Sequence, residues 1–275
     1  MSAPAPTLRV AALQLSSQEN VAENLRCVEE LVGEAARRGC ELALLPENFA
    51  YMGNETGKRE LAEALRDPQG PIQGALADLA RREHLTLIAG GFPEQSTDPA
   101  RPHNTSLLFS PDGSPGVMYR KIHLFDADLG QHGSLMESAS TLAGSDPVVA
   151  DVQGFGVGLS ICYDLRFPEL YRRLVEQGAE VLTVPAAFTA YTGKDHWHVL
   201  LRARAIEAQC YVVAAAQWGR HPGGRTTYGH TLIVDPWGGV LAETAEGVGV
   251  ACADLSRGFL TDVRARLPSL RHRRL

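Results

Sequence analysis

One cysteine differs from the other cysteines of the chain by what surrounds it. Cys162 ends the apolar run GVGLSIC and is followed by the stretch YDLR, which predicts a strand end, a turn and the start of a helix. A thiol in that place can act as a nucleophile, because a helix N-terminus lowers a thiol pKa and nearby backbone N–H groups can hold an oxyanion. Cysteines also prefer protein cores, so spacing alone favours a nucleophile and a plain buried side chain equally.

A thiol nucleophile needs a base and a group that balances charge. None of the 9 histidines stands out as its partner. Glu47 follows the apolar run Glu41–Leu45, and Lys121 ends the run VMYRK, so both also fall at predicted strand ends. Glutamate and lysine side chains are mostly exposed in folded proteins, so each of these two, taken alone, is better explained as a solvated surface residue.

Three longer stretches favour a catalytic role for these single residues. PENFAYMG at Pro46–Gly53, YRKIHLFD at Tyr119–Asp126 and ICYDLRFPEL at Ile161–Leu170 resemble the signature blocks of the nitrilase, or carbon–nitrogen hydrolase, superfamily. Each block occurs once, the blocks follow the order of the family, and the resemblance runs from about Leu8 to the C-terminus. Three ordered blocks are far more specific than any one motif.

The elements that must position these residues alternate between strands and helices. Among them are strands at Leu8–Leu15, Glu41–Leu45, Val148–Val152 and Phe155–Cys162, and helices between Val21 and Ala35 and at Pro168–Gln177 and His196–Ala208. Ser16 could begin a capping box for the first helix. This pattern predicts one α/β domain of mixed sheet covered by helices. The resemblance implies an α-β-β-α sandwich over residues 8–275, and residues 1–7 read as a flexible tail.

The resemblance also assigns roles. It implies Glu47 as general base and acid, Lys121 as oxyanion stabiliser and Cys162 as nucleophile. Glu137, in LMESASTLAG, matches a second glutamate of the family, which would position Glu47 or the substrate nitrogen. The backbone N–H of Tyr163 would help Lys121 to stabilise the tetrahedral state, and water activated by Glu47 would then release the thioester. This chemistry requires no metal and no organic cofactor.

The residues within these blocks indicate which branch of the family the chain resembles. CYDLRFPEL resembles the amidase branch of the family and not its true nitrilases, which carry Cys-Trp-Glu. The stretches GKDHWHVLLRARAIEAQCYVVAAAQWGRH and YGHTLIVDPWG resemble the amidases of deaminated glutathione. The resemblance implies a thiol amidohydrolase that cleaves a side-chain amide of a small 2-oxo acid to the acid and ammonia. The alternatives are an omega-amidase acting on 2-oxoglutaramate or 2-oxosuccinamate, and an N-carbamoyl amidohydrolase.

Two readings from other classes stay open beside the amidase. A non-catalytic member could bind partners through the same sandwich, but retention of the four polar residues of the blocks argues against decay. A thiol redox protein would need a second cysteine close to Cys162, and Cys210 is far from it in sequence.

An anionic amide substrate needs a cationic anchor. Arg166 lies four residues after Cys162 and could reach the pocket, or it could pair with Glu169, because arginine forks serve both uses. His196, near the start of a predicted helix, could also line the pocket.

Other polar residues have simpler explanations. His221 and Arg225, in GRHPGGRTTYGH, could approach a longer substrate but are better explained as parts of a solvated loop. Asn104 is explained as a residue that caps or fills a buried turn. His196 and His198 do not share a helix face at a spacing of two, so we predict no metal site.

Composition sets outer limits. The chain is 44% hydrophobic and 21% charged, as expected of a globular protein, and its net charge of -6 argues against nucleic-acid binding. No apolar run is long enough to cross a bilayer, and no signal peptide is visible, so we predict a cytoplasmic protein without a membrane partner. The resemblance implies a homodimer through Pro168–Gln177, and the basic tail RARLPSLRHRRL is then a dimer contact or a packed terminus.

Overall fold

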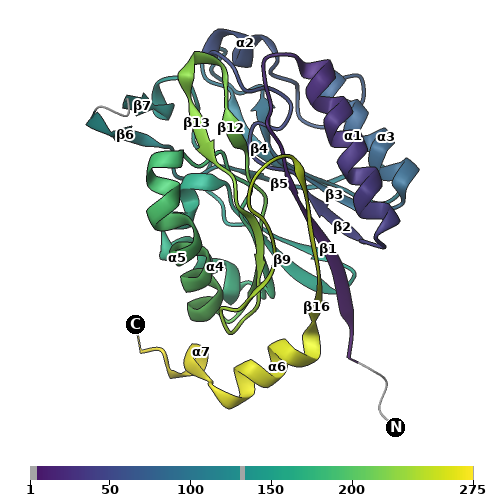
Figure 1. Ribbon diagram of the computed structural model, residues 1–275, viewed down its shortest axis with the longest axis vertical. Helices are drawn as coiled ribbons and strands as arrows, with labels where there is room; N and C mark the ends of the chain where they lie inside the picture. The colour runs from purple at the N-terminus through teal and green to yellow at the C-terminus, as the bar shows by residue number, and fades with distance from the viewer. Residues whose placement is uncertain (1–4, 131–133, 275) are drawn as a thin grey trace.

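The computed structural model describes residues 5–130 and 134–274, and its elements form four layers (Figure 1). Two six-stranded sheets lie in the middle, and a pair of helices covers the outer face of each. The covering helices are α1 (Val21–Arg37) and α3 (Pro71–Glu83) on one side, and α4 (Pro168–Glu176) and α5 (Ala190–Ala208) on the other. The predicted α-β-β-α sandwich is confirmed.

The first sheet has the strand order β16-β1-β2-β3-β4-β5. Its strands are β1 (Thr7–Gln14), β2 (Leu42–Leu44), β3 (Thr86–Glu94), β4 (His103–Phe109), β5 (Pro115–Arg120) and β16 (Gly249–Ser256). β1 pairs with β2 in parallel and with β16, from the other end of the chain, in antiparallel. The tail predicted at residues 1–7 lies partly outside the described residues, and Thr7 is the first residue of β1.

The second sheet has the order β15-β14-β11-β10-β9-β8. Its strands are β8 (Val149–Val152), β9 (Phe155–Leu159), β10 (Val181–Thr183), β11 (Tyr211–Ala214), β14 (Thr231–Val234) and β15 (Val240–Thr244). β8 and β9 pair in antiparallel as a hairpin whose turn is formed by Gln153 and Gly154. β9, β10 and β11 run parallel, so their carboxyl ends meet at one edge of the sheet.

Alternation along β1 shows how the layers are held together. Val10 and Ala12 belong to the core between the two sheets, whereas Ala11 and Leu13 belong to the core under α1 and α3. The central strands of the two sheets therefore bury both faces, which explains why β1, β2, β10 and β11 are largely apolar. Burial on this scale supplies most of the free energy that holds the four layers together.

Small elements gather at one end of the sandwich, at the top of Figure 1. They are α2 (Glu55–Glu60), the ribbon of β6 (Asp126–Asp128) with β7 (Ser134–Met136), and the ribbon of β12 (Trp218–Arg220) with β13 (Thr226–Tyr228). The chain ends at the opposite end in α6 (Arg257–Arg266) and α7 (Ser269–His272). None of the helices within the described ranges has the length and hydropathy that a membrane crossing needs.

One predicted helix cap and one predicted helix start are wrong. The side chain of Asn20, not Ser16, caps α1, because it accepts a hydrogen bond from the backbone N–H of Glu23. α5 begins at Ala190 behind Thr189, whose side chain accepts from the N–H of Thr192. His196 therefore lies inside this helix and not at its start. The capping side chain that directly precedes each helix outweighs the more distant signal.

The basic C-terminal segment packs onto its own chain. Arg264 donates to the backbone carbonyls of Gln209 and Ala179 at 3.0 and 3.1 Å, and Arg273 donates to Glu176 at 2.8 Å. These contacts fit the packed terminus expected for this segment.

Candidate active site

The three polar residues of the signature blocks meet at one end of the sandwich. Glu47 follows β2, Lys121 directly follows β5, and Cys162 follows β9, as their predicted places at strand ends require. All three line one cavity of about 200 Å³ between the sheets. Strands of both sheets therefore contribute to the site, and the rigid sandwich fixes its geometry.

Glu47 is held by hydrogen bonds to both carboxylate oxygens. Lys121 Nζ and Asn104 Nδ2 donate to Oε1 at 2.8 and 2.9 Å, and the N–H of Ala187 donates to Oε2 at 2.9 Å. The side chain is only 3% exposed. Burial alone would raise the pKa of Glu47, but the charge and hydrogen bond of Lys121 outweigh it and lower this pKa to about 2. The carboxylate is thus ionised at neutral pH, which is the state that a general base requires.

Lys121 lies between two carboxylates. Its Nζ donates to Glu47 at 2.8 Å and to the Oε1 and Oε2 atoms of Glu137 at 3.0 and 2.8 Å. Burial lowers the pKa of Lys121, but the charges of Glu137 and Glu47 reverse this and raise it above its ordinary value, so the ammonium stays charged. Glu137 also accepts from the N–H of Phe125 at 2.7 Å. Its direct ion-pair partner is Lys121, whereas the sequence pointed to Glu47 or the substrate nitrogen.

Cys162 sits in a strained turn. Its φ of 49° lies in the left-handed region, which is uncommon for a residue other than glycine and often marks a functional site. Its N–H donates to the carbonyl of Pro185 at 2.8 Å, so this amide is already occupied. The next backbone donor, the N–H of Tyr163, is the one that the sequence analysis assigned to the oxyanion.

The predicted lowering of the Cys162 pKa is wrong. Burial, followed by the charge of Glu47, raises the pKa of this thiol well above its ordinary value, although Lys121 acts in the opposite direction. A short 3₁₀ turn, Cys162–Arg166, follows the strand, and the α-helix starts only at Pro168. Since no α-helix begins at the thiol, no helix dipole offsets its burial, and the resting state is a neutral thiol beside a carboxylate.

Asp164 holds the turn at Cys162–Arg166 in place through its hydrogen bonds. This residue was not among the site residues predicted from the sequence. This fully buried carboxylate accepts from the hydroxyl of Tyr119 at 2.7 Å and from the N–H of Ile161 at 2.8 Å. His123 contributes its N–H at 3.0 Å and its Nδ1 at 2.7 Å. Asp164 thus links two of the three signature blocks, and its place inside ICYDLR was the available signal.

Arg166 faces the cavity, as its first interpretation required. Its guanidinium lies 5.0 Å from the ring centre of Phe188 and 5.8 Å from that of Tyr163, and all three residues line the cavity. His196 Nδ1 is 3.2 Å from Arg166 Nη1, but His196 is exposed and is not one of the described lining residues. A role for His196 in substrate binding therefore stays a prediction, and its direct contact is with Arg166.

The solvated-loop explanation of His221 and Arg225 is wrong. His221 is buried, with Nδ1 2.8 Å from the carbonyl of Ser17 and Nε2 2.7 Å from the hydroxyl of Thr227. Arg225 lines the cavity and donates from Nη2 to the carbonyl of Ala187 at 3.0 Å. Its Nε is buried and has no hydrogen-bond partner among the described residues. A buried guanidinium N–H without a partner is costly, so it favours an anionic ligand at this position.

Two further features of the cavity had no strong sequence signal. Lys58 of α2 lines the cavity, and its Nζ lies 3.5 Å from the hydroxyl of Thr141, which is far from Lys58 in sequence. Asn104 is buried and binds Glu47, and its Nδ2 also lies 3.4 Å from Glu137. The predicted role of Asn104 as a turn filler is therefore too modest.

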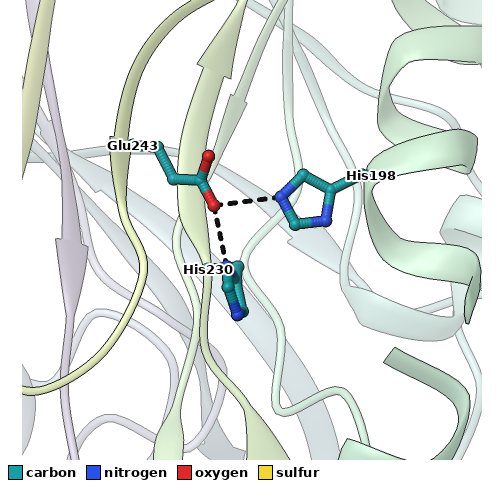
Figure 2. A group of neighbouring side chains, drawn as sticks. All are labelled: His198, His230 and Glu243. Carbon is teal, nitrogen blue, oxygen red and sulfur yellow. Dashed lines mark hydrogen bonds and ion pairs between the residues drawn. The ribbon is translucent and has the colours of Figure 1, made fainter. Parts of the chain in front are cut away.

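Within the described ranges, a single group of ligand-type side chains is close enough to share a metal ion, and it lies outside this cavity. It consists of His198, His230 and Glu243 (Figure 2). The sequence analysis predicted no metal site, having compared His198 only with His196.

Comparison with known proteins identifies the fold and the family. A family model for carbon-nitrogen hydrolases matches residues 9–265. The deaminated glutathione amidase of Synechocystis sp. (strain PCC 6803 / GT-S) is 50% identical over 266 residues, which are 96% of this chain and 97% of that protein. The chain belongs to the carbon–nitrogen hydrolase family, within the nitrilase superfamily, and is an amidase of that family.

Solved structures agree with this assignment. The NitFhit protein of C. elegans superposes with a TM-score of 0.91 at 37% identity, covering 99% of this chain and 66% of that one. An amidase from Nesterenkonia sp. AN1, solved with acrylamide added at its active-site cysteine, gives a TM-score of 0.78 at 26% identity and covers 95% of this chain and 98% of that one.

Proposed function

We propose that this protein is a deaminated glutathione amidase in which Cys162 is the nucleophile. The observation that carries the proposal is the neutral Cys162 thiol beside the ionised Glu47, with Lys121 hydrogen-bonded to that carboxylate. The name of the Synechocystis relative, at 50% identity over nearly the whole chain, supports the substrate. Small amides in general are the coarser substrate class that the family supports.

The arrangement favours attack coupled to proton transfer. Glu47 takes the proton of the Cys162 thiol as sulfur bonds to the amide carbon, which avoids a free thiolate in a buried site. Lys121 and the N–H of Tyr163 stabilise the oxyanion of the tetrahedral state. Glu47 then returns the proton to the departing nitrogen, and a thioester remains on Cys162. Finally, Glu47 activates a water molecule that hydrolyses this thioester to the acid.

The leaving group depends on the amide, which corrects the expected product. A primary amide such as 2-oxoglutaramate releases ammonia. Deaminated glutathione is instead a secondary amide whose nitrogen belongs to cysteinylglycine, so its hydrolysis yields 2-oxoglutarate and that dipeptide. The expectation of ammonia therefore holds only for the smaller omega-amides.

The cationic lining suits a substrate with two carboxylates. Arg166, Arg225 and Lys58 line the cavity in addition to Lys121, which is already paired with glutamates. We place one substrate carboxylate at Arg225, because its buried Nε is without a partner in the described part of the chain. Arg166 is the second anchor, since it lies among the aromatic side chains of the wall.

The test compares two amides on one enzyme. Product formation from deaminated glutathione and from 2-oxoglutaramate should be measured by release of cysteinylglycine and of ammonia, respectively, with wild type and Arg225→Gln. We expect deaminated glutathione to be preferred, and Arg225→Gln to raise KM by about 10-fold, the cost of one hydrogen bond to a charged group. Preference for 2-oxoglutaramate would instead make the protein an omega-amidase, and preference for N-carbamoyl substrates a carbamoylase.

We also propose that the protein is a homodimer. The family resemblance implied a dimer interface at Pro168–Gln177, the region that forms α4. Large apolar side chains are exposed on the neighbouring α5, in the turn between β14 and β15 and in β15 itself, namely Val199, Ile206, Trp237 and Leu241. Apolar groups on adjoining elements fit a protein interface better than solvent. Light scattering on the full chain should give a dimer mass, and a monomer mass at micromolar concentration would exclude this state. The cytoplasmic location and the boundary at residue 8 stay predictions.

A further inference from the structure

Three ligand-type side chains from separate elements converge on the outer face of the second sheet. His198 comes from the middle of α5, His230 directly precedes β14, and Glu243 lies in β15 (Figure 2). His198 Nε2 and His230 Nδ1 lie 3.0 and 2.7 Å from Glu243 Oε1. All three donor atoms lie within 4.8 Å of one another. Residues this far apart in sequence leave no local motif, so only the fold reveals the cluster.

The donor set matches a known class of metal site. Two neutral imidazoles and one carboxylate bind zinc and related divalent transition metals, leaving a fourth position for water. The three side chains are 33, 23 and 32% exposed, so an ion can reach them from solvent. We propose that His198, His230 and Glu243 form a binding site for one divalent transition-metal ion of the zinc class.

The surroundings hold the two imidazoles in place before any ion arrives. Trp197, which precedes His198 and is fully buried, donates from Nε1 to the carbonyl of His230 at 2.8 Å. The ring of Tyr228 stacks on that of His230 with centres 4.2 Å apart and planes 25° apart. His230 itself adopts a left-handed φ of 57°. Neighbouring groups that fix the orientation of a ligand raise its affinity for metal, so these contacts favour binding.

Binding requires a defined change in hydrogen bonding. In the ion-free cluster each histidine can donate an N–H to the shared Glu243 oxygen. To bind an ion, each neutral imidazole moves that proton to its other nitrogen, and each protonated one loses a proton to solvent. The carboxylate then moves back until each donor lies at about 2.0–2.2 Å from the ion. Because every ligand must be unprotonated at its donor atom, affinity should rise with pH.

The site would connect α5 to the β14–β15 hairpin. Thr189 and Thr192, at the start of α5, line the active-site cavity, whereas the three ligands do not. A bound ion should therefore stabilise the fold around the cavity wall and leave the amide chemistry to the Cys162 site. This role does not depend on the identity of the amide substrate.

The experiment uses Co²⁺ as a spectroscopic probe and Zn²⁺ in calorimetry, on the full metal-stripped chain in its native oligomeric state. The variants are His198→Gln, Glu243→Gln and His230→Asn, since asparagine tolerates a left-handed backbone. His272→Gln, an exposed histidine of α7, is the matched control. Circular dichroism and thermal melting verify that each variant is folded.

We expect one ion per chain and visible cobalt bands without the near-ultraviolet band of a thiolate ligand. Each ligand variant should lose affinity by at least about 100-fold, more than the loss of an outer-shell partner, and the control should bind as wild type does. Zn²⁺ should raise the melting temperature of wild type and of the control, and should not raise that of the three ligand variants. Failure of folded wild type to bind either metal overturns the proposal. So does a thiolate band, or binding that survives His198→Gln and Glu243→Gln, because the ion would then lie elsewhere.

Discussion

Cys162, in the turn after a strand of the second sheet, and Cys252, in a strand of the first sheet, have pKa values shifted in opposite directions. Cys162 follows β9 in the active-site cavity, where burial and Glu47 raise its pKa. Cys252 lies in β16, 3.5 Å from the sulfur of Cys40. The Cys40 thiol donates to it, and together with Arg38 this outweighs burial and lowers the pKa of Cys252 to about 6. Judged by pKa alone, Cys252 would be the more reactive thiol at neutral pH.

The comparison separates a reactive thiol from a catalytic one. Cys252 has a thiolate-favouring environment, but it does not line the cavity that holds Glu47 and Lys121. Cys162 is protonated at rest, yet it has a base, an ammonium and a cavity for substrate. Catalysis depends on where the proton and the oxyanion charge can go during the reaction, not on the resting charge of sulfur.

The largest expected effect on activity comes from substituting each of the two cysteines separately. Cys162→Ala should lower kcat/KM by more than about 10⁴-fold, because removing a covalent nucleophile removes the pathway itself. Cys252→Ser should stay within about twofold of wild type, as expected of a surface substitution outside the site. Steady-state assays on the preferred amide check both values. Activity that followed Cys252 would reverse the comparison.

The next largest effect comes from removing the base. Glu47→Gln keeps the size of the side chain but cannot accept the thiol proton, so kcat should fall by about 10²–10⁴-fold. Glu55→Gln is the matched control, since Glu55 lines the same cavity but is not hydrogen-bonded to the lysine and asparagine that hold Glu47. Equal losses in both variants would indicate a general effect of charge and not a proton shuttle.

A smaller effect is expected at Asn104, which positions two carboxylates. Asn104→Ala removes the hydrogen bond to Glu47, so kcat should fall by about 10-fold and the pKa of that carboxyl should rise. The acid limb of the pH–rate profile should then move to higher pH. Ser106→Ala is the control, because this buried hydroxyl in β4 binds only the backbone carbonyl of Ala89 in the contacts described. An unchanged acid limb would reduce Asn104 to a packing residue.

Labelling with iodoacetamide would sharpen the contrast in resting charge. Cys252 should be alkylated at a pH below the ordinary range of a thiol, because the Cys40 thiol and Arg38 lower its pKa. Labelling of Cys162 relative to Cys252 should increase as the pH rises toward 9, because the pKa of Cys162 is raised. Peptide mass spectrometry after timed exposure measures both rates. Labelling of Cys162 that is already maximal at pH 6 would show a resting thiolate and contradict the coupled proton transfer.

The smallest expected effect is on stability in acid. The folded pKa of Glu47 is about 2, against an ordinary value of 4.5. A lowered folded pKa means that the unfolded state binds more protons between these two values, so the contribution of Glu47 to stability is complete above pH 4.5 and is lost as the pH falls toward 2. Urea unfolding should show this loss in wild type and a weaker pH dependence in Glu47→Gln. Identical pH dependence in both would show that Glu47 is not the responsible group.

The sequence predicted the positions of the chemistry better than its electrostatics. Glu47, Lys121 and Cys162 each follow a strand, as the sequence predicted, but only the family resemblance implied that the three side chains meet, as they do in one cavity. The direction of the Cys162 pKa shift was wrong because burial, which the sequence does not reveal, dominates it. Arg225 was considered as a residue that could approach a longer substrate, but it was ranked below a solvated loop because its local sequence is rich in glycine and polar residues.

Pairings between distant segments account for most of the remainder. Cys40 and Cys252 are 212 residues apart in sequence, yet their sulfurs are 3.5 Å apart. Cysteine spacing in the sequence therefore does not reveal the Cys40–Cys252 pair. His198 meets His230 and Glu243 only because α5 packs on the hairpin of β14 and β15. Local patterns contain no information on contacts of this kind.

The most direct test of the account is to trap the acyl-enzyme. Wild type should be mixed with the preferred amide, quenched in acid within the first turnovers and digested for peptide mass spectrometry. We expect a thioester of the acyl group on the peptide that contains Cys162, and its accumulation should follow turnover when the quench is delayed. Acylation of Cys252, or steady product formation without any adduct on Cys162, would contradict the central claim.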